Sequence, residues 1–341
     1  MTTKKDTPMY KLGCGLDIGT MNIVAARETI EGEVGTRRIR DCFLDLDKEA
    51  KKSLKLSKVD FVEQDDKLVV LGDSALNMAN LFKREVRRPL SRGVIAAGEM
   101  DAQKILAILI KNVLGEPNRG STGPDHCYYS VPAEPIDLPG QSIVYHTEVF
   151  RKILHDLGWS PHPANEAMAI IFSQCAAESF SGLSVSFGSG MTNVALAYQA
   201  TKGMEFSLAR GGDSIDQNAG MAVGKTAAQM CAIKEKGIDL LDPKTREQEA
   251  IIFYVKDSIA YCLKNIASQF SKVAGTIELP DAVPFVVSGG TTKAAHFMEV
   301  FKEEFVKFQD RFPIQISEIR QATDPLTAVA EGLLVLAQQE D

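Results

Sequence analysis

The sequence predicts an α/β protein of two domains, each headed by a strand–turn–strand unit. Three observations support this: strand and helix patterns alternate along 341 residues, glycine turns follow three apolar strands, and the chain contains a weak internal repeat. The repeat pairs LDIGTMNIVAA (16–26) with VSFGSGMTNVALA (185–197). Each copy would begin one half of a duplicated fold.

The composition is that of a chain with a large core. Hydrophobic residues make up 45% and charged residues 24%, which fits about two domains. The formal net charge of −7 argues against a general nucleic-acid surface. Six cysteines without a Cys-x-x-Cys pair predict reduced core thiols in a cytoplasmic protein. Residues 1–9 form a polar tail, and no apolar run reaches about 18 residues, so we expect no membrane anchor.

Strand and helix signals follow one another through the first half. A strand, a glycine turn and a second strand occupy residues 14–28, and the charged stretch 45–66 predicts a small inserted lobe because apolar residues punctuate it. Helical periodicity predicts a helix over 99–114, and CYYSVP predicts a strand over 127–132. A second helix is predicted over 147–158, ended by Gly158.

A segment with two prolines then leads into the next helix, and its His162 is predicted to lie in a loop. The second half predicts helices near 217–234 and 246–270 and a strand that enters a glycine turn at 284–290. The last predicted helix covers 324–338, with Asp324 as its N-cap and Pro325 at its first position.

Three glycine turns follow predicted strands: Gly19-Thr20, Gly188-Ser189-Gly190 and Gly289-Gly290-Thr291. One such turn is more often a plain turn. Three in this order predict a nucleotide site, because exposed backbone N–H groups hold phosphate. The first two turns would clamp the phosphates together with the hydroxyls of Thr20 and Thr192, with Asn22 beside the first turn.

Asp17, at the end of its strand, is the candidate metal residue. It would organise Mg²⁺ through water molecules, because Mg²⁺ keeps much of its hydration shell. The alternative is a strand-end acid that caps the turn. Gly289 and Gly290 lack a Cβ and would let the backbone lie against adenine and ribose, the alternative being a simple strand–helix turn.

These motifs resemble the actin-like ATPase superfamily, which includes actin, bacterial relatives of the MreB, ParM and MamK types, heat-shock chaperone ATPases and sugar kinases. LDIGTMN is similar to its first phosphate motif, SFGSGMTNVA to the second and VVSGGTTKA to the adenosine motif. ANEAMAI and TDPLTAVAEG are similar to its two connecting helices. RPLSRGVI and ARGGDSIDQ are similar to segments of bacterial actins.

The resemblance implies a two-domain actin-like fold, a duplicated ribonuclease H-like unit with a nucleotide cleft between the domains. Residues 1–165 would form domain I with an inserted lobe at about 41–90. Residues 166–341 would form domain II with a lobe at about 214–268. ATP or ADP with Mg²⁺ would bind between them, and Gly211, Gly212 and Asp213 would line the ribose side.

One position departs from the family pattern. The family normally has Asp where this chain has Ser186, as a second carboxylate near the metal. The N–H cradle would remain, and losses of this kind weaken metal affinity or activity by about 10–100-fold. We therefore expect nucleotide binding with slow hydrolysis.

The residue that orients the attacking water is expected after YYSVP, near the start of the following helix. Bacterial actins usually have Glu there and eukaryotic actin has Gln. An extra stretch, AEPIDLPGQSIVYH, leaves the register open. Glu148 is the first candidate catalytic residue beside Asp17, followed by His146 and Gln141. Each could instead be a solvated polar residue.

The length of the sequence and the residues present favour one branch of the superfamily. The chain continues only briefly beyond the second connecting helix, which leaves no peptide-binding domain of a heat-shock chaperone, and no Asp suits a sugar kinase. We expect a filament-forming bacterial or archaeal actin whose partners are its own copies and an adaptor or cargo of unknown identity. The alternative is a non-polymerising ATPase or nucleotide-sensing binding module, such as a reactivating factor.

Overall fold

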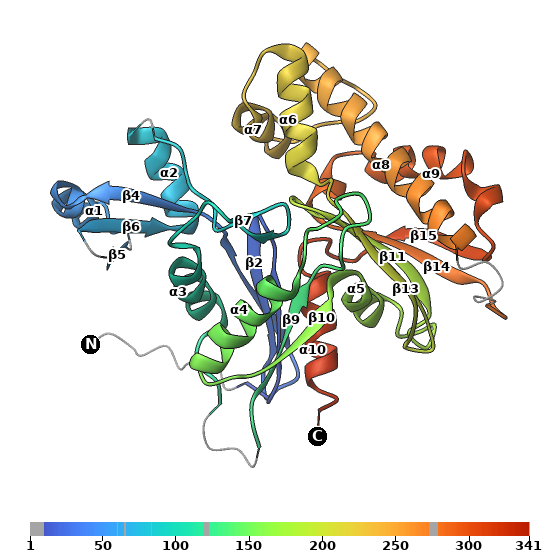
Figure 1. The fold of residues 1–341 in the computed structure, drawn as a ribbon, viewed down its shortest axis with the longest axis horizontal. Helices are drawn as coiled ribbons and strands as arrows, with labels where there is room; N and C mark the ends of the chain where they lie inside the picture. Colours follow the sequence, from blue (N-terminus) through green and yellow to red (C-terminus); the bar gives the residue numbers. More distant parts are fainter. Residues whose placement is uncertain are drawn as a thin grey trace.

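Two five-stranded sheets built on one plan form the framework of the protein (Figure 1). A computed structural model describes residues 10–340 except 60, 65, 83, 119–122 and 273–278, so the predicted tail at 1–9 lies outside the described residues. The first sheet has the order β10-β9-β1-β2-β3 and the second β13-β12-β11-β14-β15.

Both sheets begin with an antiparallel meander and add two parallel strands beside its first strand. The strands of the first sheet are β1 (Cys14–Ile18), β2 (Asn22–Glu28), β3 (Val34–Arg40), β9 (His126–Val131) and β10 (Ser160–Asn165). Those of the second are β11 (Gly182–Phe187), β12 (Thr192–Tyr198), β13 (Thr201–Leu208), β14 (Val283–Ser288) and β15 (Ile316–Gln321). The internal repeat predicted from the sequence is therefore a duplicated fold.

Two buried helices lie between the sheets: α5 (Glu166–Gln174) and α10 (Ala328–Ala337). A Cβ on Gly332 of α10 would lie 1.7 Å from the carbonyl oxygen of Ala169 in α5. A Cβ on Gly15 of β1 would lie 2.0 Å from the carbonyl oxygen of Ala330. Glycine is required at both positions because the backbones touch. The first contact fixes where α5 and α10 cross, and the second fixes α10 against β1.

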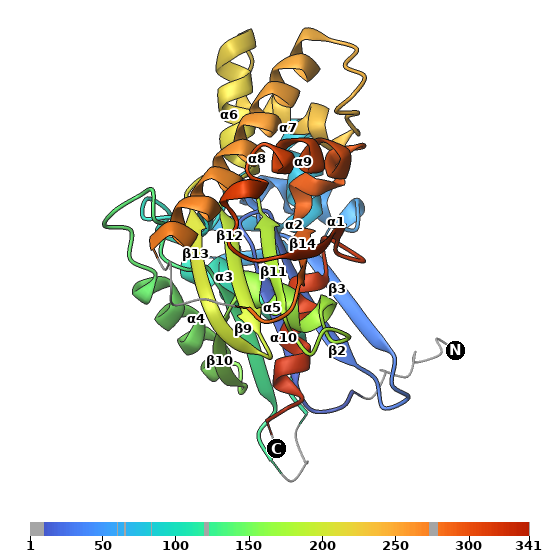
Figure 2. The same cartoon turned by 90° about the vertical axis from the view of Figure 1, so that its right-hand side faces the viewer.

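Smaller elements extend each half (Figures 1 and 2). After β3 come a three-stranded sheet and two helices, then a two-stranded sheet: β4 (Phe43–Asp47), α1 (Lys51–Leu56), β5 (Phe61–Gln64), β6 (Lys67–Leu71), α2 (Gly72–Phe82), β7 (Leu90–Ser91) and β8 (Val94–Ile95). After β13 come α6 (Gly212–Val223), α7 (Ala227–Glu235) and α8 (Arg246–Lys272). Outer helices complete the halves: α3 (Ala102–Leu114), α4 (Val144–Asp156) and α9 (Phe297–Val306).

Three local predictions differ from the structure. The proline-containing segment is an edge strand, β10, and not a loop, because an edge strand tolerates proline on its unpaired side. The helix predicted near 217–234 is two helices, because Gly224 adopts a left-handed conformation (φ 70°) that ends α6. Asp324 is not the N-cap of α10, which begins at Ala328. The Asp324 carboxylate instead accepts a hydrogen bond from the backbone N–H of Leu326, in the turn that precedes α10.

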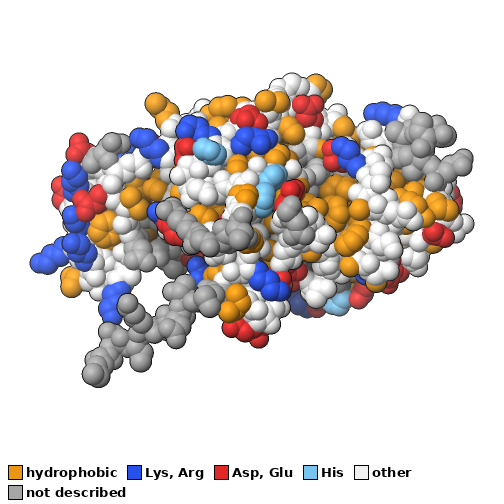
Figure 3. Space-filling model, turned by 90° about the horizontal axis from the view of Figure 1, so that it is seen from below, with side chains coloured by type: hydrophobic (Ala, Val, Ile, Leu, Met, Phe, Trp, Pro, Cys, Tyr) orange, Lys and Arg blue, Asp and Glu red, His pale blue; other side chains and the backbone are white. Residues whose placement is uncertain are grey.

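The surface carries charges of both signs. Figure 3 shows them interspersed on the lower face, with basic side chains prominent on the side of the α1 lobe. No helix among the described residues is long and apolar enough to cross a bilayer. The six cysteines, all in the described ranges, are free; five are buried, whereas Cys231 is partly exposed and so lies outside the predicted core position.

Candidate functional site

The first two glycine turns meet in space although the chain separates them widely. The first joins β1 to β2, and Gly19 donates its N–H to the carbonyl of Asn22 (3.0 Å). The second joins β11 to β12, and a Cβ on Gly190 would lie 2.3 Å from Thr20 Oγ1 and 2.3 Å from the backbone nitrogen of Gly93. Gly93 also donates its N–H to Thr20 Oγ1 (3.1 Å). No residue larger than glycine fits at position 190.

The second turn is also fastened to the N-terminus of α6. Gly212 donates its N–H to the carbonyl of Gly188 and Asp213 donates its N–H to that of Ser189, both at 2.9 Å. The Ser189 hydroxyl donates to Asp213 Oδ1 (2.7 Å). Residues 211–213 are the GGD segment. A Cβ on Gly211 would lie 2.3 Å from the carbonyl oxygen of Ser189, so the GGD segment and this turn form one continuous backbone surface.

The third glycine turn lies against the end of β11. Gly289 has φ 99°, and a Cβ there would lie 2.4 Å from the carbonyl oxygen of Phe187. A short 3₁₀ helix, Gly290–Lys293, follows. A Cβ on Gly212 would lie 3.1 Å from Thr291 Oγ1 and 3.3 Å from Lys234 Nζ, which brings the predicted adenosine motif next to the GGD segment.

Asp17 lies at the end of β1 and is partly buried. Desolvation raises its pKa to about 6, partly opposed by a hydrogen bond (2.9 Å) that the Ser130 hydroxyl donates to Oδ1. Ser130 Oγ in turn accepts from the backbone N–H of Ile18 (2.8 Å), which fixes its orientation. A carboxyl group whose pKa is raised toward neutral pH by desolvation is typical of a functional site.

Glu166 is a second partly buried acid beside Asp17, and the sequence analysis did not select it. Desolvation, and then the charge of Asp17, raise the pKa of Glu166 to about 8, while a hydrogen bond from Asn193 opposes the rise. Asn193 Nδ2 donates to Glu166 Oε2 at 2.7 Å, and the Ser207 hydroxyl donates to Asn193 Oδ1. The polar chain holds the Glu166 carboxyl in one orientation.

The local sequence explains why Glu166 lies there. Asn165 caps α5 by accepting from the backbone N–H of Ala167 (2.9 Å) and Met168 (3.2 Å), which places Glu166 at the first helical position. The available signal was ANEAMAI itself, a capping Asn followed by an acid at the start of a connecting helix.

The predicted water-orienting residues lie elsewhere. Glu148 is on the exposed side of α4, where its carboxylate pairs with Arg151 (3.2 Å). His146 is 1% exposed, in edge-to-face contact with Phe150 (ring centroids 4.7 Å apart). Gln141 donates to the carbonyl of Arg92 (3.3 Å) and so lies against the β7–β8 turn. Among the contacts of the described residues, none joins Glu148 or His146 to Asp17.

Two further residues that the sequence analysis discussed are buried in the second sheet. Thr192 is buried, and its hydroxyl donates to the carbonyl of Arg210 (2.7 Å). Ser186 is buried opposite Asn193 in the β11–β12 pair and beside Ser288 of β14. Directly opposed residues share one face of a sheet, so Ser186 lies on the face that carries Asn193 and Glu166.

The arrangement of the two sheets and the meeting turns defines an actin-like fold. The fold is similar to that of MamK in a double helical filament (TM-score 0.70, 15% identity, 97% of this chain and 99% of that chain). MreB5 of Spiroplasma citri bound to ADP matches at TM-score 0.60 and 16% identity over 94% of each chain. The ethanolamine utilization protein EutJ from Carboxydothermus hydrogenoformans matches at TM-score 0.56 and 16% identity (96% of this chain, 90% of that chain).

A model of the Volactin family matches residues 12–337, and the chain belongs to that family. A comparison with curated proteins yields no significant match.

Proposed function

We propose that the protein binds ATP and ADP with Mg²⁺ between the two halves of its fold, hydrolyses ATP slowly and assembles into filaments. The observation that carries the proposal is the meeting of two glycine turns, from two different sheets, beside the partly buried acids Asp17 and Glu166. The N–H groups of both turns would hold the phosphates, as oriented backbone amides do in other phosphate sites.

The acids present fit a magnesium ion. Burial disfavours the charged forms of Asp17 and Glu166, and a cation beside them would stabilise those forms. Mg²⁺ prefers oxygen ligands and retains water, which suits carboxyl groups held slightly apart from the phosphates. When bound, Mg²⁺ would neutralise phosphate charge. Asp17 is the proposed metal residue.

Glu166 is the proposed water-orienting residue, in place of Glu148. Its position at the first turn of α5 and its hydrogen bond from Asn193 hold the carboxyl in a fixed direction near Asp17. A polar group fixed in this way can orient a water molecule, and in its ionised form it can accept a proton from it. Because Asn193 donates to Oε2, the other oxygen of Glu166 is the one available for this role.

The adenosine side of the proposed site is the surface of the third turn and the GGD segment. Gly289 and Gly290 would lie beside adenine and ribose, with Thr291, Gly212 and Lys234 around them. The Lys234 ammonium group is held by Asp216 (2.8 Å) and by the carbonyl of Gly212 (3.2 Å), so it would stiffen this wall.

Filament assembly is the proposed consequence of nucleotide binding. Ligand held by both turns would draw the two halves together, and copies in the closed shape would stack head to tail. A heterologous contact of this kind does not close on itself and therefore propagates. MamK, with the same fold, is described as a double helical filament.

Pelleting by ultracentrifugation with ATP, with ADP and without nucleotide tests assembly, and thermal shift with nucleotide and Mg²⁺ tests binding. We expect pelleting with ATP and a raised melting temperature with either nucleotide. Asp17→Ala should remove most of the Mg²⁺ dependence of that shift. A protein that shows the thermal shift but stays monomeric in all conditions would be the nucleotide-dependent binding module. Absence of any thermal shift at millimolar nucleotide would contradict the whole proposal.

A further inference from the structure

Strand β3 is an open edge of the first sheet. It pairs with β2 over its whole length, from Asn22↔Arg40 to Glu28↔Val34, without a bulge, and no strand pairs with its other side among the described residues. Residues 34–38 are all exposed, and Figure 2 shows β3 at the outer margin of the molecule. Such an edge offers a row of unpaired N–H and C=O groups to another chain.

The opposite edge of the same sheet is protected against pairing with another strand, whereas the β3 edge is not. Strand β10 carries Pro161 and Pro163, which remove two N–H donors from that edge. Strand β3, with the sequence VGTRRIR, contains no proline. Its distinguishing feature is positive charge.

The charge of β3 is left uncompensated at two positions. Arg40 pairs with Glu235 (2.7 Å) and lies 3.6 Å from Asp73, but neither Arg37 nor Arg38 has an ion-pair partner within the described part of the chain. Adjacent residues of a strand point to opposite faces, so this basic edge (Val34–Arg40) presents one free guanidinium group on each face.

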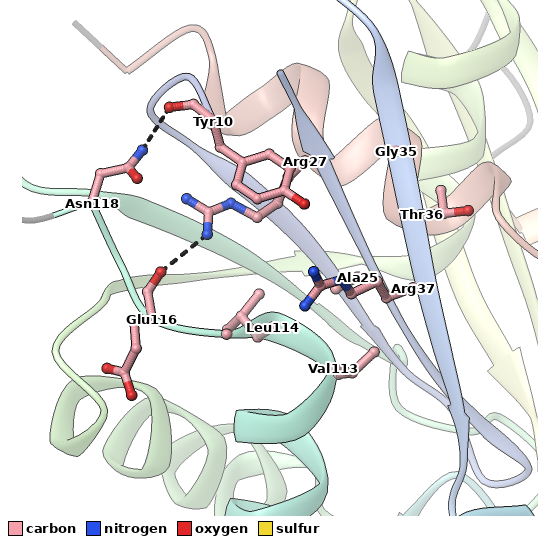
Figure 4. A pocket seen from close by; sticks show the side chains of 11 residues that line it. Tyr10, Ala25, Arg27, Gly35, Thr36, Arg37, Val113, Leu114, Glu116 and Asn118 are labelled. Atoms are coloured by element: carbon pink, nitrogen blue, oxygen red, sulfur yellow. Dashed lines mark hydrogen bonds between the residues drawn. The ribbon is translucent and has the colours of Figure 1, made fainter. Parts of the chain in front are cut away.

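A pocket of about 340 Å³ adjoins the basic edge (Figure 4). Gly35 lines the pocket and stands directly opposite Arg27 in the β2–β3 pair. A Cβ on Gly35 would come no closer than 3.9 Å to its nearest neighbour, the carbonyl oxygen of Arg27, so the pocket is open at this position. Ala25, Val113 and Leu114 form an apolar lining. In Figure 4 the Arg37 side chain reaches from β3 over the pocket toward Leu114.

Arg27 lines this pocket, and contacts with its neighbours hold its side chain in place. Its guanidinium group lies 4.5 Å from the centre of the Tyr10 ring, and donates to the Glu116 carbonyl (3.1 Å) and to Asp125 (3.2 Å). The Glu116 carboxylate lies 3.3 Å from Lys111. With these charges balanced, Arg37 supplies the net positive charge at the pocket.

We infer that the basic edge binds an extended, acidic segment of a partner protein, which adds a sixth strand beside β3. Backbone pairing would supply affinity, and alternating side chains would supply specificity. Acidic side chains on the two faces of the segment would meet Arg37 and Arg38, and an apolar side chain would enter the pocket. This inference does not depend on nucleotide binding.

Charge separates this occupant from the others. Two copies paired through β3 would bring arginines from both strands together, and like charges across a strand pair are destabilising. Residues 1–9 contain two lysines and one aspartate, so that segment has the wrong sign. A nucleic acid would match Arg37 and Arg38 but would meet a chain of net charge −7.

The test is fluorescence anisotropy of a fluorescein-labelled (Glu-Glu-Val-Val)₂ peptide, which as a strand places both Glu and Val on each face, titrated with the full chain without nucleotide. We expect saturable binding that weakens with salt. Arg37→Glu should weaken it about tenfold or more, and Gly35→Leu, which fills the pocket, should weaken it severalfold. Lys264→Glu, the same charge change at an exposed site on α8, is the matched control and should bind like the unchanged protein.

Two control peptides separate strand addition from simple charge attraction. A version with adjacent central residues replaced by proline should lose binding, because it cannot pair along β3. The inference is overturned if that peptide or (Glu)₈ binds as well as (Glu-Glu-Val-Val)₂, if a single-stranded DNA competes at equal charge, or if no peptide binds. It is also overturned if Arg37→Glu converts an oligomer to a monomer in size-exclusion chromatography, since the edge would then be a contact between copies.

Discussion

The guanidinium group of Arg88 donates to both carboxylate oxygens of Asp213, at 3.0 Å each. Arg88 precedes β7, and Asp213 is in the first turn of α6, so this ion pair joins the part of the chain that carries the first sheet to the part that carries the second. Asp213 also accepts from Ser189 in the second glycine turn (2.7 Å). The pair therefore connects the relative position of the two halves to the geometry of the proposed phosphate site.

We predict that Arg88→Gln weakens nucleotide binding severalfold. The partly exposed pair contributes about 1 kcal/mol, and its loss frees Asp213 from one of its two partners. Isothermal titration with ADP and Mg²⁺ measures the change. Arg151→Gln, which breaks an exposed pair on α4, is the control and should leave the affinity unchanged.

We predict that Glu166→Gln slows ATP hydrolysis by roughly 100-fold while ADP affinity stays within severalfold. The amide keeps the size of the side chain but cannot accept a proton from water. Phosphate release under single-turnover conditions measures the rate. Glu148→Gln serves as the comparison and should hydrolyse ATP at the original rate; the reverse result would return the water-orienting role to Glu148.

We predict that Ser186→Asp makes the stability of the protein depend more strongly on Mg²⁺. The new carboxylate would replace a buried serine on the sheet face of Asn193, whose amide contacts Glu166, and a further acid there is unfavourable unless a cation balances it. The variant should melt at a lower temperature in EDTA and regain stability with Mg²⁺ and ATP, with hydrolysis faster than in the original chain. Equal melting curves with and without Mg²⁺ would show that position 186 does not face the metal.

We predict that His146 makes the folded state sensitive to acid. Burial lowers its pKa from 6.5 to about 4, and neither ring nitrogen has a hydrogen-bond partner. The folded state keeps His146 neutral while the unfolded chain binds a proton, so its contribution is present above pH 6.5 and is lost as the pH falls toward 4. Urea unfolding of His146→Leu across that range should show a weaker loss of stability, by about 1–3 kcal/mol between its ends. Parallel curves for the two proteins would contradict the prediction.

The sequence predicted the fold well because its strongest signals are local. LDIGTMNIVAA and VSFGSGMTNVALA each encode two strands and a tight turn within a dozen or so residues, and their similarity reveals the duplication. The edge strand β10 was missed for the opposite reason. Its prolines are typical of a loop, and only the strand order of the sheet shows that this segment is an edge strand with one unpaired side.

The candidate site was predicted in its backbone and less fully in its side chains. Glycine turns can be recognised directly in a sequence. The identity of the acid beside Asp17, by contrast, depends on which helix the folded chain brings next to β1. The extra residues between β9 and α4 drew attention to Glu148, but α5, which follows β10, brings Glu166 to Asp17. Lys234 and Arg88 were missed because their partners are distant in the chain, where residue spacing carries no signal.

The contact between Gly332 and Ala169 limits how the molecule can move. Helices that cross with side chains between them can slide by small repacking steps, but here backbone meets backbone at one point and leaves no such layer. Motion of the two sheets relative to each other therefore has the character of a pivot. A bulky side chain at position 332 would force α5 and α10 apart, and the glycine turns carried by the two sheets would then shift relative to each other.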